Sequence, residues 1–228
     1  MRYLIIGLGI YGTNLARDLT TLGNQVIGAD IKQSATTPLK DYISQVYIVA
    51  TTDEESLDVL PLKNVDLVIV AIGENFGASV KTVALLKKKN VPHIFARAID
   101  ELHRSILECF KIDRILTPEQ RAASDQAYEM MFGGNVETMS VDRDTIILQF
   151  KARGYFLGEE YSKLNLSEFA ITLIAATRNQ VSTSVLNIRS ESPKLLDTSD
   201  ANCTVSEGDT FTCIGSRAAF RSLLKRIS

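Results

Sequence analysis

The sequence has 228 residues, of which 45% are hydrophobic and 23% charged, and this suits one large or two small globular domains. Its net charge of −2 excludes the strongly basic surface expected of a nucleic-acid-binding protein. The longest apolar run, Leu67–Ile72, is far shorter than the roughly 20 residues that span a bilayer. A glycine motif begins at residue 7, so we expect no signal peptide, and we expect any membrane association to act through a partner. Three widely spaced cysteines, an odd number, predict reduced thiols rather than disulfides or a zinc site.

The amino-terminal stretch predicts a nucleotide-binding turn. The apolar run Tyr3–Ile6 is typical of a buried parallel strand, and Thr13–Leu22 has helical spacing. Between them, Gly7, Gly9 and Gly12 follow the G-x-G-x-x-G pattern. In such a turn the glycines allow a tight bend, close approach of a phosphate to the backbone, and close packing of the helix on the strand.

An acidic residue follows at the spacing expected for ribose recognition. Asp30 ends the next apolar run, Val26–Ala29, eighteen residues beyond Gly12. A carboxylate there accepts hydrogen bonds from a ribose diol and repels a 2′-phosphate. The alternative is a domain of the same fold that has lost its nucleotide.

The rest of the first half alternates strands and helices, which predicts a doubly wound parallel sheet of the Rossmann type. We expect Thr52 to be the N-cap of a short helix through Leu60, with Glu55 reaching back to it. The other expected strands are Gln25–Ala29, Gln45–Val49, Asp66–Ile72, His93–Ala98 and Arg114–Thr117. The other expected helices lie near Pro38–Ile43, around Val80–Leu86 with Lys87–Lys89 at its end, and at Glu101–Phe110.

The second half predicts a smaller α+β domain. A helix over Gln120–Phe132 ends at Gly133–Asn135, so we expect a nucleotide-binding domain at 1–118, a crossover helix and linker at 119–136, and a regulatory domain at 137–228. Its expected elements are a hairpin around Asp142–Asp144, a short helix at Glu159–Leu164, a strand at Ile171–Thr177, a polar loop at Glu191–Asn202, a turn at Glu207–Asp209, a strand at Thr210–Ile214 and a closing helix at Arg217–Ile227.

Four segments of the first half resemble the RCK domains of the TrkA-like regulatory subunits of Trk/Ktr potassium-uptake systems. They are GLGIYGTNLARDL with GAD, ATTDEESL, NVDLVIVAIGENFGASV, and HIFARA with RILTPE. The turn Gly154–Gly158, the strand Leu173–Arg178 and Glu207–Asp209 resemble the carboxy-terminal module of the same subunits. The resemblance extends over nearly the whole chain.

The resemblance implies a gating subunit rather than an enzyme. Such subunits lie in the cytoplasm at the inner face of the membrane, bind ATP, ADP or NAD(H), and assemble as dimers within an octameric ring. They dock on a potassium-conducting membrane protein, and cyclic di-AMP is a known effector of their carboxy-terminal domain.

The resemblance also assigns site residues. The cofactor-binding positions are Gly7, Gly9, Ile10, Tyr11 and Gly12 at the phosphates, Asp30 with Ile31 and Lys32 at the ribose, Thr51 and Thr52 beside the base, Ala71, Ile72, Gly73 and Glu74 under the ligand, and Arg97 near the phosphates. Glu119 corresponds to a glutamate that helps to hold Mg²⁺ or another cation beside the phosphates.

Two positions depart from the family pattern. Ile10 stands where an arginine often contacts the terminal phosphate, and Ala50 stands where an Asp or Asn usually precedes the residues that read adenine. Loss of the arginine removes a charge-assisted contact. The sequence therefore leaves open whether ATP and ADP are distinguished, and whether NAD(H) is the ligand.

Other functions and simpler roles stay open. An NAD-dependent oxidoreductase would need an acid/base near the nicotinamide, and His93 and His103, the two histidines, both lie outside the second half. A stand-alone nucleotide sensor is the third possibility. Arg97 has a simpler role as an ion-pair partner of Asp30 or Glu74, and Glu119 as a first-turn acid that the helix dipole favours. The segment Met130–Phe132 is expected to be core or a dimer contact.

Overall fold

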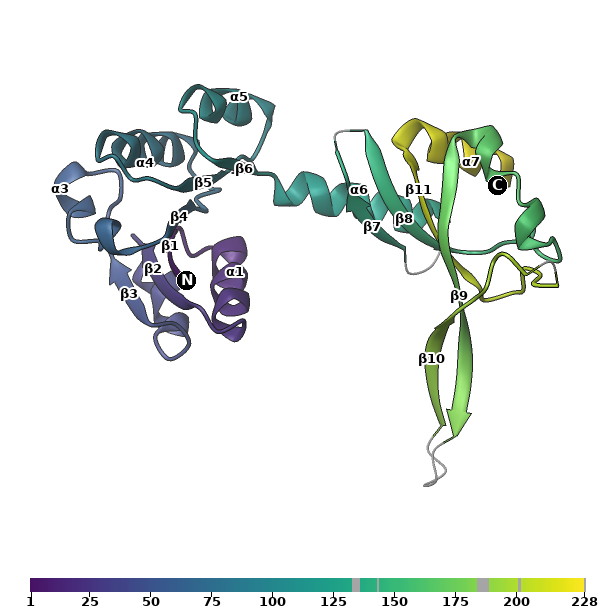
Figure 1. Cartoon of the computed structure of the whole chain (residues 1–228). Coiled ribbons are helices and arrows are strands. Elements are labelled where there is room, and N and C mark those ends of the chain that lie inside the picture. The colour runs from purple at the N-terminus through teal and green to yellow at the C-terminus, as the bar shows by residue number, and fades with distance from the viewer. Residues whose placement is uncertain (133–135, 143, 184–188, 201, 228) are drawn as a thin grey trace. The chain divides into compact units, whose positions relative to one another are not determined.

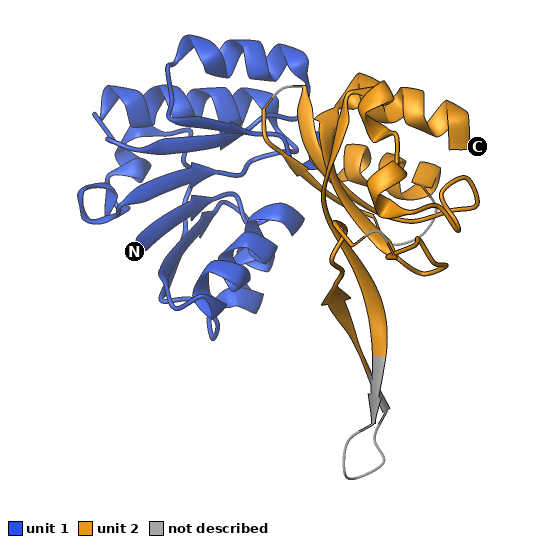
Figure 2. Ribbon diagram, turned by 45° about the vertical axis from the view of Figure 1, so that its right-hand side comes forward, with its two compact units in different colours: residues 1–120 blue, residues 121–228 orange. Residues whose placement is uncertain are grey.

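The computed structural model describes residues 1–132, 136–142, 144–183, 189–200 and 202–227. The chain divides into two compact units, Met1–Gln120 and Arg121–Ser228, coloured blue and orange in Figure 2. Each unit has its own hydrophobic core and is described by itself. Over the described ranges, no helix combines the length and the hydropathy needed to cross a bilayer.

Unit 1 is built on a parallel six-stranded sheet, which confirms the predicted Rossmann-type fold. The strands are β1 (Arg2–Ile6), β2 (Gln25–Asp30), β3 (Gln45–Ile48), β4 (Leu67–Val70), β5 (Ile94–Arg97) and β6 (Arg114–Leu116). Their order is β3-β2-β1-β4-β5-β6, so the winding reverses between β1 and β4. In open sheets of this kind, ligands bind at the carboxyl ends of the strands beside that reversal.

Both faces of this sheet are covered, and successive residues of β1 pack into different cores. Leu4 packs with Val83 and Leu107 on the side of α4 and α5, whereas Ile5 packs with Ala16 on the side of α1. Figure 1 shows α1 on one side of the sheet and α4 and α5 on the other. The helices are α1 (Ile10–Thr21), α2 (Gln33–Thr36), α3 (Glu54–Leu57), α4 (Phe76–Lys88) and α5 (Glu101–Cys109), with 3₁₀ turns at Thr37–Leu39 and Leu62–Asn64.

Two local predictions for unit 1 are wrong. Asp53, not Thr52, is the N-cap of α3, because its carboxylate accepts hydrogen bonds from both the backbone N (2.8 Å) and the hydroxyl (2.7 Å) of Ser56. The short helix expected near Pro38–Ile43 lies earlier, at Gln33–Leu39. Pro38 stands in the first turn of its 3₁₀ part, where a missing N–H breaks no helical hydrogen bond.

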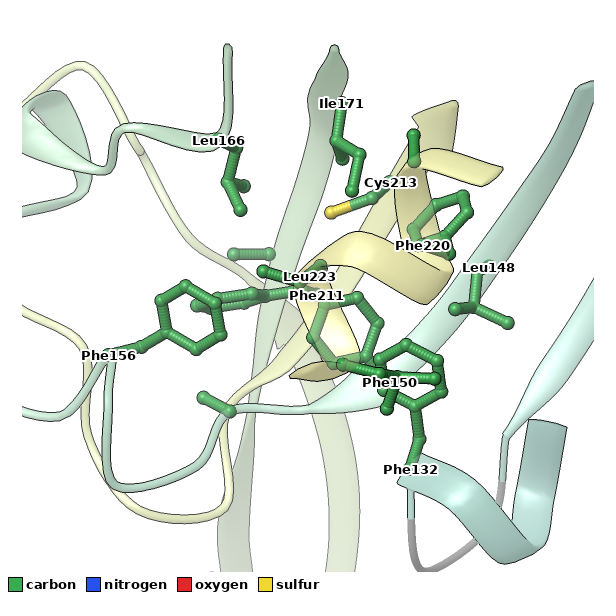
Figure 3. Packing of buried hydrophobic residues seen from close by; sticks show 14 of the residues in the cluster. Phe132, Leu148, Phe150, Phe156, Leu166, Ile171, Phe211, Cys213, Phe220 and Leu223 are labelled. Carbon is green, nitrogen blue, oxygen red and sulfur yellow. The ribbon is translucent and has the colours of Figure 1, made fainter. Parts of the chain in front are cut away.

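In its described residues, unit 2 contains an antiparallel sheet and two flanking helices, which confirms the predicted α+β class. Its described strands are β7 (Glu137–Ser140), β8 (Thr145–Lys151), β9 (Ile171–Thr183), β10 (Arg189–Leu195) and β11 (Thr210–Ser216), in the order β10-β9-β11-β8-β7. The helices are α6 (Pro118–Phe132), whose first residues belong to unit 1, and α7 (Arg217–Ile227), with 3₁₀ turns at Tyr161–Lys163 and Leu166–Phe169. Figure 3 shows aromatic rings from α6, α7, β8 and β11 meeting in the core: Phe132, Phe220, Phe150 and Phe211.

Strand β9 contains an extra residue that decides which side chains face this core. The strand pairs with β11 on both sides of Ile174, which has no partner on β11. Such a bulge reverses the alternation of the residues that follow it. Ala176 is therefore fully buried, and Arg178 reaches the buried Asp209.

The predicted polar loop at Glu191–Asn202 is wrong in its first part. Residues up to Leu195 belong to β10, which pairs with β9 in a ribbon that extends beyond the rest of the sheet (Figure 1). Residues 191–195 are exposed throughout, so no apolar alternation marks the strand. Only a 3₁₀ turn, Tyr161–Lys163, stands where a helix is expected at Glu159–Leu164. The expected boundary at Gly133–Asn135 lies outside the described residues.

Candidate nucleotide-binding site

The turn between β1 and α1 requires glycine at its first position. Gly7 has a φ of +93°, which side-chain-bearing residues rarely adopt, and a Cβ there would lie 2.8 Å from the backbone N of Ile72. Its own N–H donates to the carbonyl of Ala29 at 2.8 Å. The turn is thus held against the ends of both β2 and β4.

The other two glycines have opposite surroundings. A Cβ on Gly12 would overlap the carbonyl oxygen of Gly7, so only glycine allows α1 to lie this close to β1. A Cβ on Gly9 would meet no described heavy atom within 4 Å. The chain is therefore tightly packed behind the turn and open in front of Gly9, as phosphate binding requires.

The amino terminus of α1 has the features of an anion site. Gly9 is the N-cap, and within unit 1, which is described in full, no side chain caps the helix and no acidic residue stands in its first turn. The first N–H groups of a helix lack intrahelical partners and favour negative charge. Ile10, with 88% of its surface exposed, adds no charge there.

Asp30 is fixed beside this turn by backbone hydrogen bonds. One carboxylate oxygen accepts from Leu8 N at 2.7 Å and the other from Lys32 N at 2.8 Å. A carboxylate oxygen accepts more than one hydrogen bond, so both retain capacity for a ribose diol. Lys32 in turn forms a 2.9 Å ion pair with Glu74, which lowers the pKa of Glu74 and raises that of Lys32.

Arg97 is bound to Glu119 rather than to the carboxylates expected for it. Its guanidinium donates from Nη2 to Glu119 Oε1 and from Nε to Oε2 at 3.4 Å, so the predicted pairing with Asp30 or Glu74 is wrong. It lies 5.6 Å from the ring centre of Tyr11 and so close to Gly73 that a Cβ there would be 2.5 Å from Nη1. Burial raises the pKa of Tyr11 despite the nearby guanidinium.

The two threonines expected at the base have different environments. Thr51 is 6% exposed, and its hydroxyl lies 3.0 Å from that of Thr82 on α4. Thr52 is half-buried, and its hydroxyl has no hydrogen-bond partner in the described structure. Of the two, Thr52 is the one whose side chain remains available to a ligand.

The two histidines and Glu119 have structural contacts. His93 is exposed and lies 3.1 Å from Asp113, while His103 is fully buried, and burial lowers its pKa. His103 Nδ1 accepts from Ile99 N at 3.4 Å. Among the described residues no group of three or more His, Cys, Asp or Glu side chains gathers into a metal site, and Glu119 is engaged by Arg97.

Sequence reasoning missed Thr82, although a weak signal was present. Ser79 and Thr82 interrupt the apolar face of α4, and both are fully buried. Buried hydroxyls require hydrogen-bond partners. The sequence alone cannot name those partners, because they come from a different βα unit.

Together the glycine turn, the open helix terminus and the fixed carboxylate define a domain of the Rossmann class. Residues 3–118 match the model of the TrkA-N domain, and the chain belongs to this family. The expected resemblance to the TrkA-like regulatory subunits is thereby confirmed.

Two curated relatives share substantial identity with the chain. Ktr system potassium uptake protein A of Bacillus subtilis (strain 168) is 34% identical over 119 residues, which is 52% of this chain and 54% of the relative. Ktr system potassium uptake protein C of the same strain is 28% identical over 179 residues, 78% of this chain and 81% of the relative. The first match therefore spans only about half of that relative's length.

Among solved structures, the GsuK channel bound to NAD is similar over 100% of this chain and 39% of that chain, with a TM-score of 0.61. The two are 14% identical, so the likeness shows a shared fold.

Proposed function

We propose that this protein is a regulatory subunit that binds an adenine nucleotide, ATP or ADP, or NAD(H), and controls a potassium-conducting membrane protein. The observation that carries the nucleotide part is the open space in front of Gly9 at the uncapped terminus of α1, within the fully described unit 1. Asp30, at the end of the neighbouring strand, supplies the ribose acceptor. A phosphate and a ribose fit these two groups at once.

The potassium part is supported by the names of the relatives. Two Ktr system potassium uptake proteins match this chain, and the matching GsuK structure is a channel with NAD bound. The subunit would lie in the cytoplasm at the inner face of the membrane and self-associate as a dimer within an octameric ring. Cyclic di-AMP is the candidate effector for the second domain.

Gating in this proposal requires no chemical reaction. Two nucleotides that bind two shapes of the assembly with different affinities shift the population between those shapes, and the membrane partner responds to the shift. In this proposal Arg97 and Glu119 are the charged side chains whose pairing depends on which nucleotide is bound. A phosphate competes with Glu119 for Arg97, whereas a cation such as Mg²⁺, held between Glu119 and the phosphates, would release Arg97.

The first experiment is a thermal-unfolding titration with ATP, ADP, AMP, NAD⁺ and NADH. A ligand at a hundredfold excess over its Kd stabilises the native state by about 2.7 kcal/mol. Asp30→Asn should weaken this stabilisation, while Asp18→Asn, which makes the same charge change on the exposed face of α1, should not. Absence of stabilisation by all five compounds would refute nucleotide binding.

The second experiment tests the partner. The tagged protein should co-purify with a potassium-conducting membrane protein, and the complex should respond to the nucleotide that stabilises the subunit. Turnover of NADH with a small substrate would instead support the oxidoreductase alternative. Nucleotide binding without a membrane partner would support a stand-alone sensor.

A further inference from the structure

A buried pair of threonines joins two elements of unit 1. Thr51 follows β3, and Thr82 lies in the middle of α4, thirty-one residues later. Their hydroxyl oxygens are 3.0 Å apart, and Thr82 Oγ1 lies 3.3 Å from the carbonyl oxygen of Thr51. Their exposed fractions are 6% and 0%, so water does not compete for these hydrogen bonds.

The proton arrangement follows from these distances. Each hydroxyl has one proton to donate and can accept from others. If Thr82 donates to the carbonyl of Thr51, then the hydroxyl of Thr51 donates to Thr82 Oγ1, and both protons are used. The pair therefore fixes the backbone of Thr51 as well as its side chain.

The segment that is fixed lies at the base end of the candidate site. Val49 N donates to the carbonyl of Asp30 at 2.9 Å, so the chain leaving β3 runs beside the ribose acceptor. Thr52 comes directly after the fixed residue, with its hydroxyl unbonded in the described structure. Asp53 then begins α3.

Two ion pairs also connect the α3 region with the end of α4, and their contribution to stability is small. Lys88 pairs with Glu54 at 2.7 Å, and Lys89 pairs with Asp58 at 2.5 Å. In each pair one partner is largely exposed, and such pairs contribute little. The threonine pair thus adds a buried, directional connection between this loop and α4 to the apolar packing of Leu57 in the same core as Val83.

We propose that Thr82 is a positioning residue for base recognition: through Thr51 it sets the loop that presents Thr52 to an adenine base. This inference rests on the proposed nucleotide binding. Thr82 itself touches no ligand, because its side chain is fully buried. The backbone carbonyl of Thr51 is thus bonded by a hydroxyl from α4, not by a side chain of the loop itself.

The test compares ADP and GDP binding by calorimetry in the full-length protein. Thr82→Val keeps the shape and removes both hydrogen bonds, and we expect about fivefold weaker ADP binding, the size of one net hydrogen bond. GDP binding should stay within about twofold of wild type, because its contacts to α1 and Asp30 are intact. The ratio of the two affinities should therefore fall.

Three variants control this result. Thr82→Ser restores the hydroxyl and should restore the ratio. Thr51→Val leaves the bond to the carbonyl and should give a smaller loss than Thr82→Val. Ser79→Ala removes a buried hydroxyl one turn away on α4 that has no partner among the described residues, and it should change nothing in binding.

The outcomes separate this inference from the proposed function. If wild type binds ADP and Thr82→Val keeps the wild-type ratio of ADP to GDP affinity, Thr82 is not a positioning residue for the base. Equal losses for ADP and GDP would overturn it as well, as would failure of Thr82→Ser to rescue. If wild type binds neither ADP nor any of ATP, AMP, NAD⁺ and NADH, the proposed function itself fails.

Discussion

Each unit contains a cluster of polar or charged groups. The two clusters differ in whether these groups have hydrogen-bond partners within the protein. In unit 2 the fully buried carboxylate of Asp209 accepts from Arg178 Nε (2.6 Å) and Nη2 (2.8 Å), from the hydroxyl of Tyr161 (2.8 Å) and from Ser206 N (2.8 Å). In unit 1 the terminus of α1 has no capping side chain from any residue of that unit. One cluster has its hydrogen bonds within its own unit, and the other leaves helix N–H donors without a capping side chain.

The comparison explains why burial and charge alone do not indicate a ligand site. Asp209 is more deeply buried than Asp30, yet its carboxylate already accepts four hydrogen bonds from protein groups. Burial alone would raise the pKa of Asp209, but the hydrogen bonds from Arg178, Ser206 and Tyr161 outweigh it and hold the pKa below its usual range. The unused donors, not the charge, mark the candidate site.

The largest expected effect is on unit 2. Asp209→Ala should lower the free energy of unfolding by about 3 kcal/mol, the lower end for a broken buried ion pair, because Arg178 is partly exposed. Urea denaturation measures this. Nucleotide binding should be unchanged under native conditions. A loss below about 1 kcal/mol would contradict the structural role of the cluster.

A smaller effect is expected at the glycine turn. Gly12→Ala should destabilise unit 1 by about 2 kcal/mol, because the added methyl overlaps Gly7 O. Gly9→Ala has open space and an ordinary extended backbone, so its stability should stay within about 0.5 kcal/mol of wild type. Its nucleotide affinity should still fall about tenfold, which corresponds to about 1.4 kcal/mol. Unchanged affinity in Gly9→Ala would show that no phosphate lies there.

The pH dependence of stability sharpens the contrast. The pKa of Asp209 is lowered on folding, so its contribution is complete above about 3.9, the unfolded value, and is lost as pH falls through the folded value. The stability difference between wild type and Asp209→Asn should therefore shrink on acidification below pH 4. It should shrink by about 1.4 kcal/mol for each unit that separates the two pKa values. A difference independent of pH would contradict this.

The smallest expected effect concerns the ion pair at the mouth of the candidate site. Lys32 and Glu74 are 63% and 86% exposed at the side chain, so a double-mutant cycle with alanine should give no resolvable coupling in unfolding at physiological salt. The coupling should also decrease with added salt. A clear coupling that added salt does not reduce would show that the pair is more than a surface contact.

The sequence predicts the parts of unit 1 that depend on local pattern. The glycine spacing, the apolar runs and Asp30 are readable because each acts within one strand-turn-helix segment. The predicted partner of Arg97 is wrong, and the contact of Thr82 with Thr51 was not predicted. Both contacts depend on which segments lie side by side in the fold. Asp53 rather than Thr52 caps α3, because Ser56 provides two hydrogen-bond donors to the carboxylate of Asp53.

In unit 2 the same reasoning is less successful for a physical reason. Strand β10 buries none of its residues 191–195, so no hydrophobic alternation marks it. The buried role of Asp209 was also missed: a Gly-Asp turn usually lies on the surface, and here the carboxylate turns inward to Arg178. That contact depends on the antiparallel pairing of β9 and β11, which the sequence pattern alone does not reveal.

The unpaired Ile174 in β9 has a consequence for how related chains can differ in length. Deletion of this one residue would make the strand regular and still leave Ala176 and Arg178 on the core side, because the bulge already accounts for the extra residue. Loss of a second residue between Leu173 and Arg178 would instead turn Arg178 outward and leave Asp209 without its cation. In an alignment of relatives we therefore expect a one-residue gap to be tolerated between Leu173 and Arg178 and a two-residue gap to be excluded there.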